Sequence, residues 1–286
     1  KLDEHQTTMA LGMAGSMASG VIHNFGTMTK PLHAGMTCRD GVMAAQLAQR
    51  GLTAGEQILE HPVGFVQTVI GEGHYELDEM AENLGKPFRI QDALIIKKYP
   101  CCGGNHAMLD SLFSMMREHN FTYEDVAHAE IDQSYVSTVM LYTEPDDPLK
   151  GKFSAKYNVA AALVDGGIAI DTFTDGKIAD PKLQDTMEKV TMNVKSKWEQ
   201  EGGIVSKGVP VRITLKDGRV LAHETPREEI LGGQVNPWGF DSIKGKFDVN
   251  ASLILSKDRV QETIETWSDI TQVDDVAAAI RQTLVK

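Results

Sequence analysis

A lysine and a histidine, Lys30 and His33, lie three positions apart around Pro31 in the stretch NFGTMTKPLHAG, between segments rich in Gly, Ala and Met. Proline is favoured in the first turn of a helix, so this stretch predicts a helix start. The free N–H groups of a helix start carry partial positive charge, and an ammonium and an imidazole beside them form a seat for an anion. A substrate that carries carboxylates suits this chemistry. An exposed lysine beside a capping histidine is the other interpretation of the same spacing.

A second group of reactive side chains lies in KKYPCCGGNH, residues 97–106. Lys97, Lys98, Cys102 and His106 precede a predicted helix there, which makes a second potential anion seat. Adjacent cysteines do not pair without backbone strain, and a small buried residue explains these thiols better than a nucleophile does.

Tyr157 lies in GKFSAKYNVAAAL, on a predicted helix made largely of Ala and Val. A buried tyrosine hydroxyl beside cations can donate or accept a proton. A core tyrosine with one satisfied hydrogen bond fits the same pattern, and the residues alone leave both interpretations open.

Composition excludes several functional classes. The chain has 286 residues, 42% of them hydrophobic, and a formal net charge of -12, without the clustered Lys and Arg that a nucleic acid or an anionic membrane surface requires. Only three cysteines occur, so neither a disulfide framework nor a zinc spacing is available, and we expect no metal and no cofactor. The cysteine usage favours a reducing compartment, which is the cytoplasm or, in a eukaryote, the mitochondrial matrix. No apolar run approaches the length of a membrane span.

The elements that must position these residues follow from hydrophobic periodicity. The segment from Thr7 to Ile22 is apolar and almost uncharged, which predicts a helix buried on nearly all sides. Further predictions are helices at 31–50, 53–60, 75–85, 154–165, 181–189, 258–269 and 274–286, strands at 126–135 and 190–195, and a hairpin at 209–225.

This order of helices, mixed elements and helices predicts an α+β fold with an inserted middle. We expect a discontinuous, mostly helical domain made of residues 1–92 and 237–286, and an α+β lid made of residues 93–236.

Four stretches in this order resemble the MmgE/PrpD family: ALGMAGSMASGVIHNFGTMTKPLHAGMTCRDGVMAAQLAQRGLTA, YPCCGGNHAMLD, KFSAKYNVAAALVDG and DGRVLAHETP. The resemblance covers essentially the whole chain. It implies the same division into helical domain and lid, an active site between them, and homodimers that pair through the helical domains.

The resemblance also implies roles for individual residues. Catalytic roles are implied for Lys30, Lys97, Tyr157 and His106. We expect the substrate to be bound by His33, Thr29, Lys98 and Cys102.

The implied function is a metal-independent lyase that acts on a small di- or tricarboxylic acid, of the 2-methylcitrate dehydratase type. Elimination of water needs a proton removed next to a carboxylate, with cations to stabilise the charge and an acid or base such as Tyr157 or His106. In cis-aconitate decarboxylases of this family a functional histidine takes the position of Cys102, so this departure argues against that reaction. The alternatives are an epimerase or isomerase of a small dicarboxylic acid, and a non-catalytic subunit or fragment.

Members of the family usually carry a helical portion before the GMAGSMASG helix, which supplies an aspartate and histidines to the active site. The resemblance therefore leaves two alternatives: the chain is a fragment, or a separate N-terminal half-chain associates with it and completes the site. The other partners that we expect are a small carboxylate substrate and a second copy of the chain.

Overall fold

The computed structural model describes residues 1–82, 84–86, 88, 90, 94–133, 142–194, 209–226, 229–230, 232 and 236–283. The chain divides into two compact units, residues 1–93 with 97–230 and residues 94–96 with 231–286, and each is described by itself. Across the described ranges, no helix combines the length and apolar character that a bilayer crossing requires.

A four-stranded mixed sheet lies at the centre of the α+β part of the first unit. Its strands are β1 (Val126–Gln133), β2 (Val190–Val194), β3 (Val211–Leu215) and β4 (Val220–His223), in the order β2-β1-β3-β4. Strand β1 pairs parallel with β2 and antiparallel with β3. Alternation along β3 buries Val211, Ile213 and Leu215 and exposes Arg212, so one face of the sheet joins the core. The predicted strands and hairpin are confirmed within the described residues.

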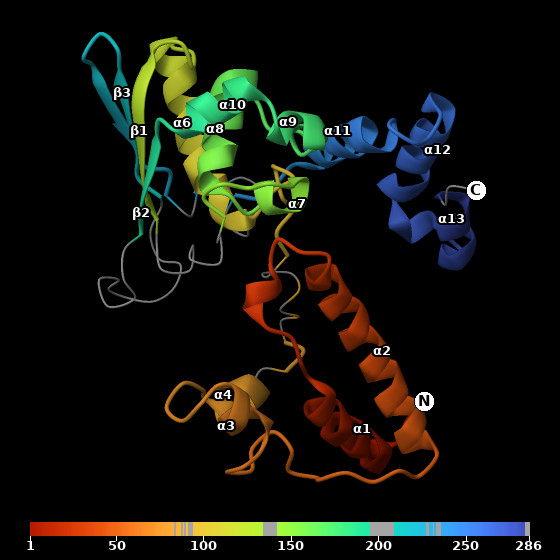
Figure 1. Ribbon diagram of the computed structural model, residues 1–286. Helices are drawn as coiled ribbons and strands as arrows, with labels where there is room; N and C mark the ends of the chain where they lie inside the picture. Colours follow the sequence, from red (N-terminus) through yellow and green to blue (C-terminus); the bar gives the residue numbers. More distant parts are fainter. Residues whose placement is uncertain are drawn as a thin grey trace. The chain divides into compact units, whose positions relative to one another are not determined.

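Helices cover that apolar face of the sheet (Figure 1). They are α6 (His106–His119) and α8 (Ala155–Asp165). Helix α10 (Pro181–Met187) packs against α8, and the short helices α7 (Pro148–Gly151) and α9 (Asp175–Ile178) lie in the same unit. Helix α8 begins where the Ser154 side chain accepts a hydrogen bond from the Tyr157 N–H, and it ends at Gly166 in a left-handed conformation. Leu109, Leu112 and Ile131 are fully buried between the helices and the sheet.

The start of the chain forms a helical hairpin. Helices α1 (Glu4–Met17) and α2 (Thr29–Gln49) pack through Met9, Met13, Ala44 and Ala48. The Asp3 side chain caps α1, and Gly51, with φ of 90°, follows the end of α2. The predicted helix at 53–60 forms turns instead, and α3 (Phe65–Val69) and α4 (Leu77–Glu82) follow it.

The prediction that the first helix is buried on nearly all sides is wrong for the described chain. Only Met9, Gly12 and Met13 of α1 are buried, and Leu11 remains 52% exposed. The cause is that α1 contacts α2 and the turns around Ala54, and these cover one of its faces. An apolar sequence predicts that a helix will be covered, but it does not name the covering element.

Within its described residues, the second unit contains three α-helices and the short segment 94–96. These helices are α11 (Phe240–Ala251), α12 (Lys257–Ser268) and α13 (Val276–Thr283). Ala251, Val260 and Ala279 supply its buried side chains, and the Ile96 N–H donates to the Gly232 carbonyl at 3.0 Å. The predicted helices near the end of the chain are confirmed as far as Thr283, while their return to a shared helical domain stays a prediction.

Candidate functional site

Lys30 is the second residue of α2 and is already helical, although a residue before proline is biased towards extended backbone. Its ammonium lies over two aromatic rings, 4.8 Å from the centroid of Phe25 and 4.8 Å from that of Phe153. The two ring centroids are 5.8 Å apart. Among the side chains that the structure describes, no carboxylate pairs with Lys30. The ammonium is therefore held by neutral ring faces.

The loop before α2 is fixed by short contacts. The Thr27 hydroxyl donates to the Asn24 carbonyl at 2.8 Å and accepts from the Thr29 N–H at 3.2 Å. The Tyr142 hydroxyl donates to the Phe25 carbonyl at 2.9 Å, which ties the loop to a residue more than a hundred positions away. The backbone at Thr29 and Phe25 is thus set before a substrate binds.

His33 lies one turn further along α2 and is half-buried. Its Nδ1 atom would be 3.1 Å from a Cβ atom at Gly20, so the imidazole ring lies against the backbone between α1 and α2. The predicted group of Thr29, Lys30 and His33 therefore occupies the start of one helix, as the spacing predicts.

In the loop at residues 97–106, the Lys97 ammonium donates to the Cys101 carbonyl at 3.0 Å. The Lys98 ammonium instead pairs with the Asp110 carboxylate at 2.7 Å. The Tyr99 hydroxyl donates to the same carboxylate oxygen at 2.7 Å. Asp110 thus neutralises the charge of Lys98, so this lysine attracts an anionic substrate more weakly than an unpaired lysine would.

The two adjacent thiols differ in environment. Burial raises the pKa of the Cys101 thiol to about 12, with a smaller contribution from Cys102, while the nearby charges of Lys97 and Lys152 act in the opposite direction. Cys102 is half-buried, and its N–H donates to the Lys152 carbonyl at 2.9 Å. Cys101 is therefore a protonated core residue.

Residues 152 and 153 join the two predicted clusters. Lys152 contacts the 97–106 loop through its carbonyl and its charge, and Phe153, the next residue, lies against Lys30. The Lys152 ammonium lies 5.6 Å from the centroid of the Phe173 ring. The structure thus brings the Lys30 region and the Lys97 region to one turn between α7 and α8.

Tyr157 and His106 are buried side chains of the first unit. Tyr157 is 0% exposed, and its hydroxyl donates to the Thr172 carbonyl at 2.6 Å. Burial, followed by the charges of Asp165 and Asp180, raises the pKa of this hydroxyl above its usual value. His106 is 3% exposed and lies edge-on to Tyr99 with ring centroids 5.3 Å apart. Both are core side chains here, and their catalytic roles stay predictions.

The sequence-based reasoning missed Phe25, Phe153, Lys152 and Tyr142. Phe25 and Lys152 lie inside stretches that were already of interest, NFGTMTKPLHAG and GKFSAKYNVAAAL. The nearest signal was the pairing of an aromatic and a basic residue in each stretch, but no spacing rule connects two stretches so far apart.

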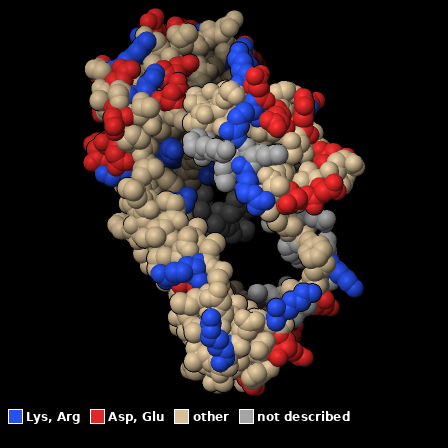
Figure 2. All heavy atoms as spheres, turned by 90° about the vertical axis from the view of Figure 1, so that its right-hand side faces the viewer, with Lys and Arg blue, Asp and Glu red and all other residues tan. Residues whose placement is uncertain are grey.

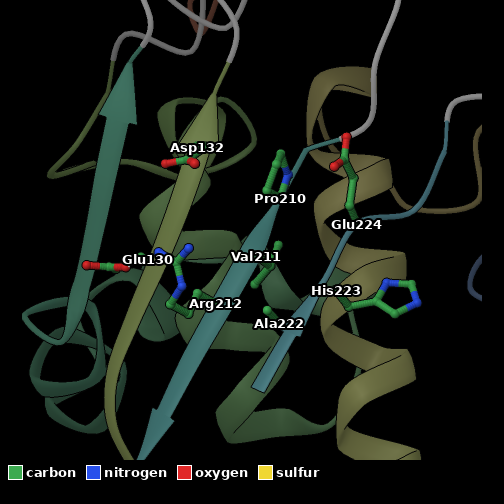
Figure 3. A pocket seen from close by; sticks show the side chains of 8 residues that line it. All are labelled: Glu130, Asp132, Pro210, Val211, Arg212, Ala222, His223 and Glu224. Atoms are coloured by element: carbon green, nitrogen blue, oxygen red, sulfur yellow. Dashed lines mark hydrogen bonds and ion pairs between the residues drawn. The ribbon is translucent and has the colours of Figure 1, made fainter. Parts of the chain in front are cut away.

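A separate pocket of about 230 Å³ lies on the outer side of the sheet, and none of the predicted functional residues lines it. Figure 3 shows Arg212 of β3 directed towards Glu130 of β1, whereas His223 of β4 points the other way, towards a helix. The Arg212 and Glu130 side chains form an ion pair at 2.7 Å. Because its basic side chain is already neutralised, this pocket is a poor candidate for an anion.

Charges of both signs are distributed over the face of the molecule in Figure 2, where Lys and Arg side chains alternate with Asp and Glu. In the first unit, Lys30 and Lys152, whose ammonium groups lie over aromatic rings, are candidates for attracting an anion. Within the ranges that the structure describes, no group of three or more His, Cys, Asp or Glu side chains is arranged to hold a metal ion.

Comparison with known proteins gives matches along most of the chain. A model of the MmgE/PrpD N-terminal domain matches residues 1–78, and a model of the MmgE/PrpD C-terminal domain matches residues 99–270. Among curated relatives, a cis-aconitate decarboxylase of Mus musculus is 25% identical over 95% of this chain and 56% of its own length.

Two further relatives extend this comparison. The cis-aconitate decarboxylase of Homo sapiens is 26% identical over 97% of this chain and 57% of its own length. The cis-aconitate decarboxylase-like protein oryM of Aspergillus oryzae is 23% identical over 95% of this chain and 60% of its own length. The chain therefore spans a little over half the length of the curated relatives it matches.

Proposed function

Because the chain belongs to the MmgE/PrpD family, we propose that it forms part of a lyase that acts on a small di- or tricarboxylic acid. The observation that carries this proposal is the Lys30 ammonium, which lies over two neutral rings close to the turn that contacts the 97–106 loop. Two of the relatives are cis-aconitate decarboxylases, which act on a tricarboxylic acid, and their names support the same class of reaction.

The proposed chemistry requires cations more than any other group. Elimination of water and loss of carbon dioxide both build negative charge on a carbon conjugated to a carboxylate, and that charge spreads onto the carboxylate oxygens. In this proposal Lys30 and Lys97 bind those oxygens and stabilise the developing charge, which is typically worth about 3 kcal/mol per donor. Such acid–base chemistry requires neither a metal nor a cofactor.

Binding of the substrate is assigned to groups around these two lysines. The N-terminus of α2 contributes Thr29 and His33, and the half-buried Cys102 lies beside Lys152. Lys98 acts in this proposal through Asp110, to which it is paired, and so contributes less to the net charge of the site. We add Lys152 as a third cation, which suits a tricarboxylic acid.

Within the lyase class, the first reaction to test is elimination of water from 2-methylcitrate, and the second is decarboxylation of cis-aconitate. A thiol at Cys102, where the resemblance implies a histidine in the decarboxylases, favours the first. The names of the relatives favour the second.

One experiment separates these reactions. The protein is incubated with each acid in deuterated water, and the products are followed by NMR together with released carbon dioxide. Elimination gives an alkene without carbon dioxide, decarboxylation gives both, and an epimerase returns the starting acid with deuterium at one carbon. We expect an alkene product, and the presence or absence of carbon dioxide then tells decarboxylation from elimination of water. If neither acid reacts in the presence of the completing partner described below, the proposal is contradicted.

Tyr157→Phe is expected to lower the free energy of unfolding by about 1 kcal/mol below pH 10, because the buried hydroxyl loses its bond to Thr172. Since the folded pKa of Tyr157 is raised above its usual value of 10.0, the unfolded state loses this proton first as pH rises. Wild-type stability should therefore fall above pH 10, and the advantage over the variant should shrink. Urea unfolding at pH 8 and pH 10.5 measures both effects.

The same variant tests the catalytic assignment. On this geometry we expect Tyr157→Phe to reduce turnover less than Lys30→Ala does. A loss of turnover as large as that of Lys30→Ala, with unchanged stability, would instead identify the hydroxyl as the proton-transfer group that the family resemblance implies.

We also propose that the exposed apolar faces of α1 and α2 are covered in the active protein. Leu11 is 52% exposed, Leu32 55% and Val42 60%, and an apolar surface of this kind is typical of an interface. A helical segment corresponding to the remaining length of the relatives, on a separate N-terminal half-chain, is the proposed partner, and homodimers are proposed for the completed protein. Co-expression of the two parts followed by size-exclusion chromatography with light scattering tests both.

A further inference from the structure

We propose that Phe25 and Phe153 are positioning residues whose two adjoining rings together hold the Lys30 ammonium and orient it towards a substrate carboxylate. Neither ring was expected at the site, and each belongs to a different part of the first unit. The inference deepens the proposed function, because it explains how the lysine of that site is held before the substrate arrives.

Hydrogen bonds fix the backbone around Phe153. Its side chain is 7% exposed, and its N–H donates to the Lys150 carbonyl at 2.8 Å. The buried Asn158 amide donates to the Gly151 carbonyl at 2.9 Å and to the Ser154 carbonyl at 2.6 Å. These two acceptors flank Phe153 in the sequence. These bonds fix the turn between α7 and α8, and with it the orientation of the ring.

The Phe25 ring is fixed by an equivalent set of contacts. The Tyr142 hydroxyl holds the Phe25 carbonyl, and the Tyr142 ring lies so close to Gly26 that no Cβ atom fits there. Tyr142 therefore fixes the backbone at Phe25, and with it the position of the Phe25 ring beside Lys30.

A pair of aromatic rings can hold a lysine ammonium without neutralising its charge, whereas a carboxylate neutralises it. The negative face of a ring attracts an ammonium by about 0.5–2 kcal/mol, and it leaves the full positive charge in place. Lys98 provides the contrast within the same chain, because its ammonium is neutralised by Asp110. Lys30, held by rings, keeps both its charge and its N–H donors for an incoming anion.

The arrangement also links two distant segments. Phe25 precedes α2, whereas Phe153 lies between α7 and α8, so Lys30 contacts both rings only when these segments are in contact. We therefore infer that contact between the α2 loop and the α7–α8 turn completes the substrate-binding form of Lys30.

A fluorinated series at position 153 tests the cation–π contact through activity. Replacing Phe153 by phenylalanines with one, two and three fluorines keeps the shape but removes charge from the ring face. We expect the logarithm of kcat/KM to fall steadily along the series, with most of the change in KM, and Phe153→Leu to raise KM about 10-fold. A flat series would overturn the proposal.

A matched control separates this effect from general damage to the core. Phe121 is 4% exposed, close to the value for Phe153, and no lysine lies over its ring in the described part of the chain. Phe121→Leu should therefore lower stability without raising KM. A similar rise in KM in both variants would show that Phe153 acts only through packing.

A second measurement does not depend on turnover. Lysines of the full chain are reductively methylated with ¹³C, and the Lys30 methyl resonance is assigned with Lys30→Arg. We expect an upfield ring-current shift of this resonance, which Phe153→Leu and Phe25→Leu each reduce and Phe121→Leu leaves unchanged. Titration with tricarballylate, a tricarboxylate without a leaving group, should perturb the same resonance.

The NMR shift and the turnover measurement test different parts of the proposal, so one can fail while the other succeeds. An unshifted Lys30 resonance overturns the ring contact itself. A shifted resonance that responds to Phe153→Leu and to tricarballylate, in a protein without turnover, upholds the positioning role and counts against the lyase function.

Discussion

Lys30→Ala is expected to reduce turnover of a 2-methylcitrate-like or cis-aconitate-like acid by about 10²–10³-fold, while the protein keeps its fold. The loss follows from removing one preorganised donor that stabilises the negative charge of the transition state. The fold should survive because alanine is a good helix former and the Lys30 ammonium, among the described side chains, forms no ion pair that its removal would leave open. Steady-state kinetics and circular dichroism of the same preparation measure the two expectations.

Lys182→Ala is the matched control for this substitution. Its ammonium also lies over an aromatic ring, 4.1 Å from the Tyr123 centroid, but on α10 and outside the proposed site. We expect this variant to retain its activity. Equal activity of the Lys30→Ala protein and the wild type, in a preparation that turns over substrate, would show that Lys30 has no part in the reaction.

Gly26→Ala is expected to lower the free energy of unfolding by about 2–4 kcal/mol and to disturb the Phe25 ring. Gly26 has φ of 80°, a left-handed conformation that costs a residue with a Cβ atom about 1–2 kcal/mol. The added methyl would in addition overlap the Tyr142 ring, so the ring or the loop must move. Urea unfolding and the KM for the acid substrate report the two consequences.

Gly35→Ala is the control for this glycine. Gly35 lies within α2, and a Cβ atom there would meet nothing within 4 Å. Removing a glycine from a helix interior should stabilise the protein by about 0.5–1 kcal/mol. In a Tyr142→Ala background, Gly26→Ala should cost only its backbone strain; an unchanged cost would mean that the Tyr142 ring is not what excludes the methyl.

The local elements of this protein could be predicted from its sequence. Period-two alternation placed β3 and β4 on either side of a Lys-Asp-Gly turn, and Pro31 with Gly51 bounded α2. The four stretches that resemble the MmgE/PrpD family pointed to Lys30 and Lys97 as candidate site residues. These signals are local because hydrogen-bonding periodicity, capping and turn chemistry act over a few residues.

Only the tertiary structure decided how these residues are used. It directed the Tyr157 hydroxyl to Thr172, paired Lys98 with Asp110, and placed Lys30 over the rings of Phe25 and Phe153. It also left much of α1 exposed, although the sequence of that helix is apolar. The physical reason is the same in each case: a side chain's type states which partners it can accept, whereas the partner it receives depends on packing between segments far apart in the chain.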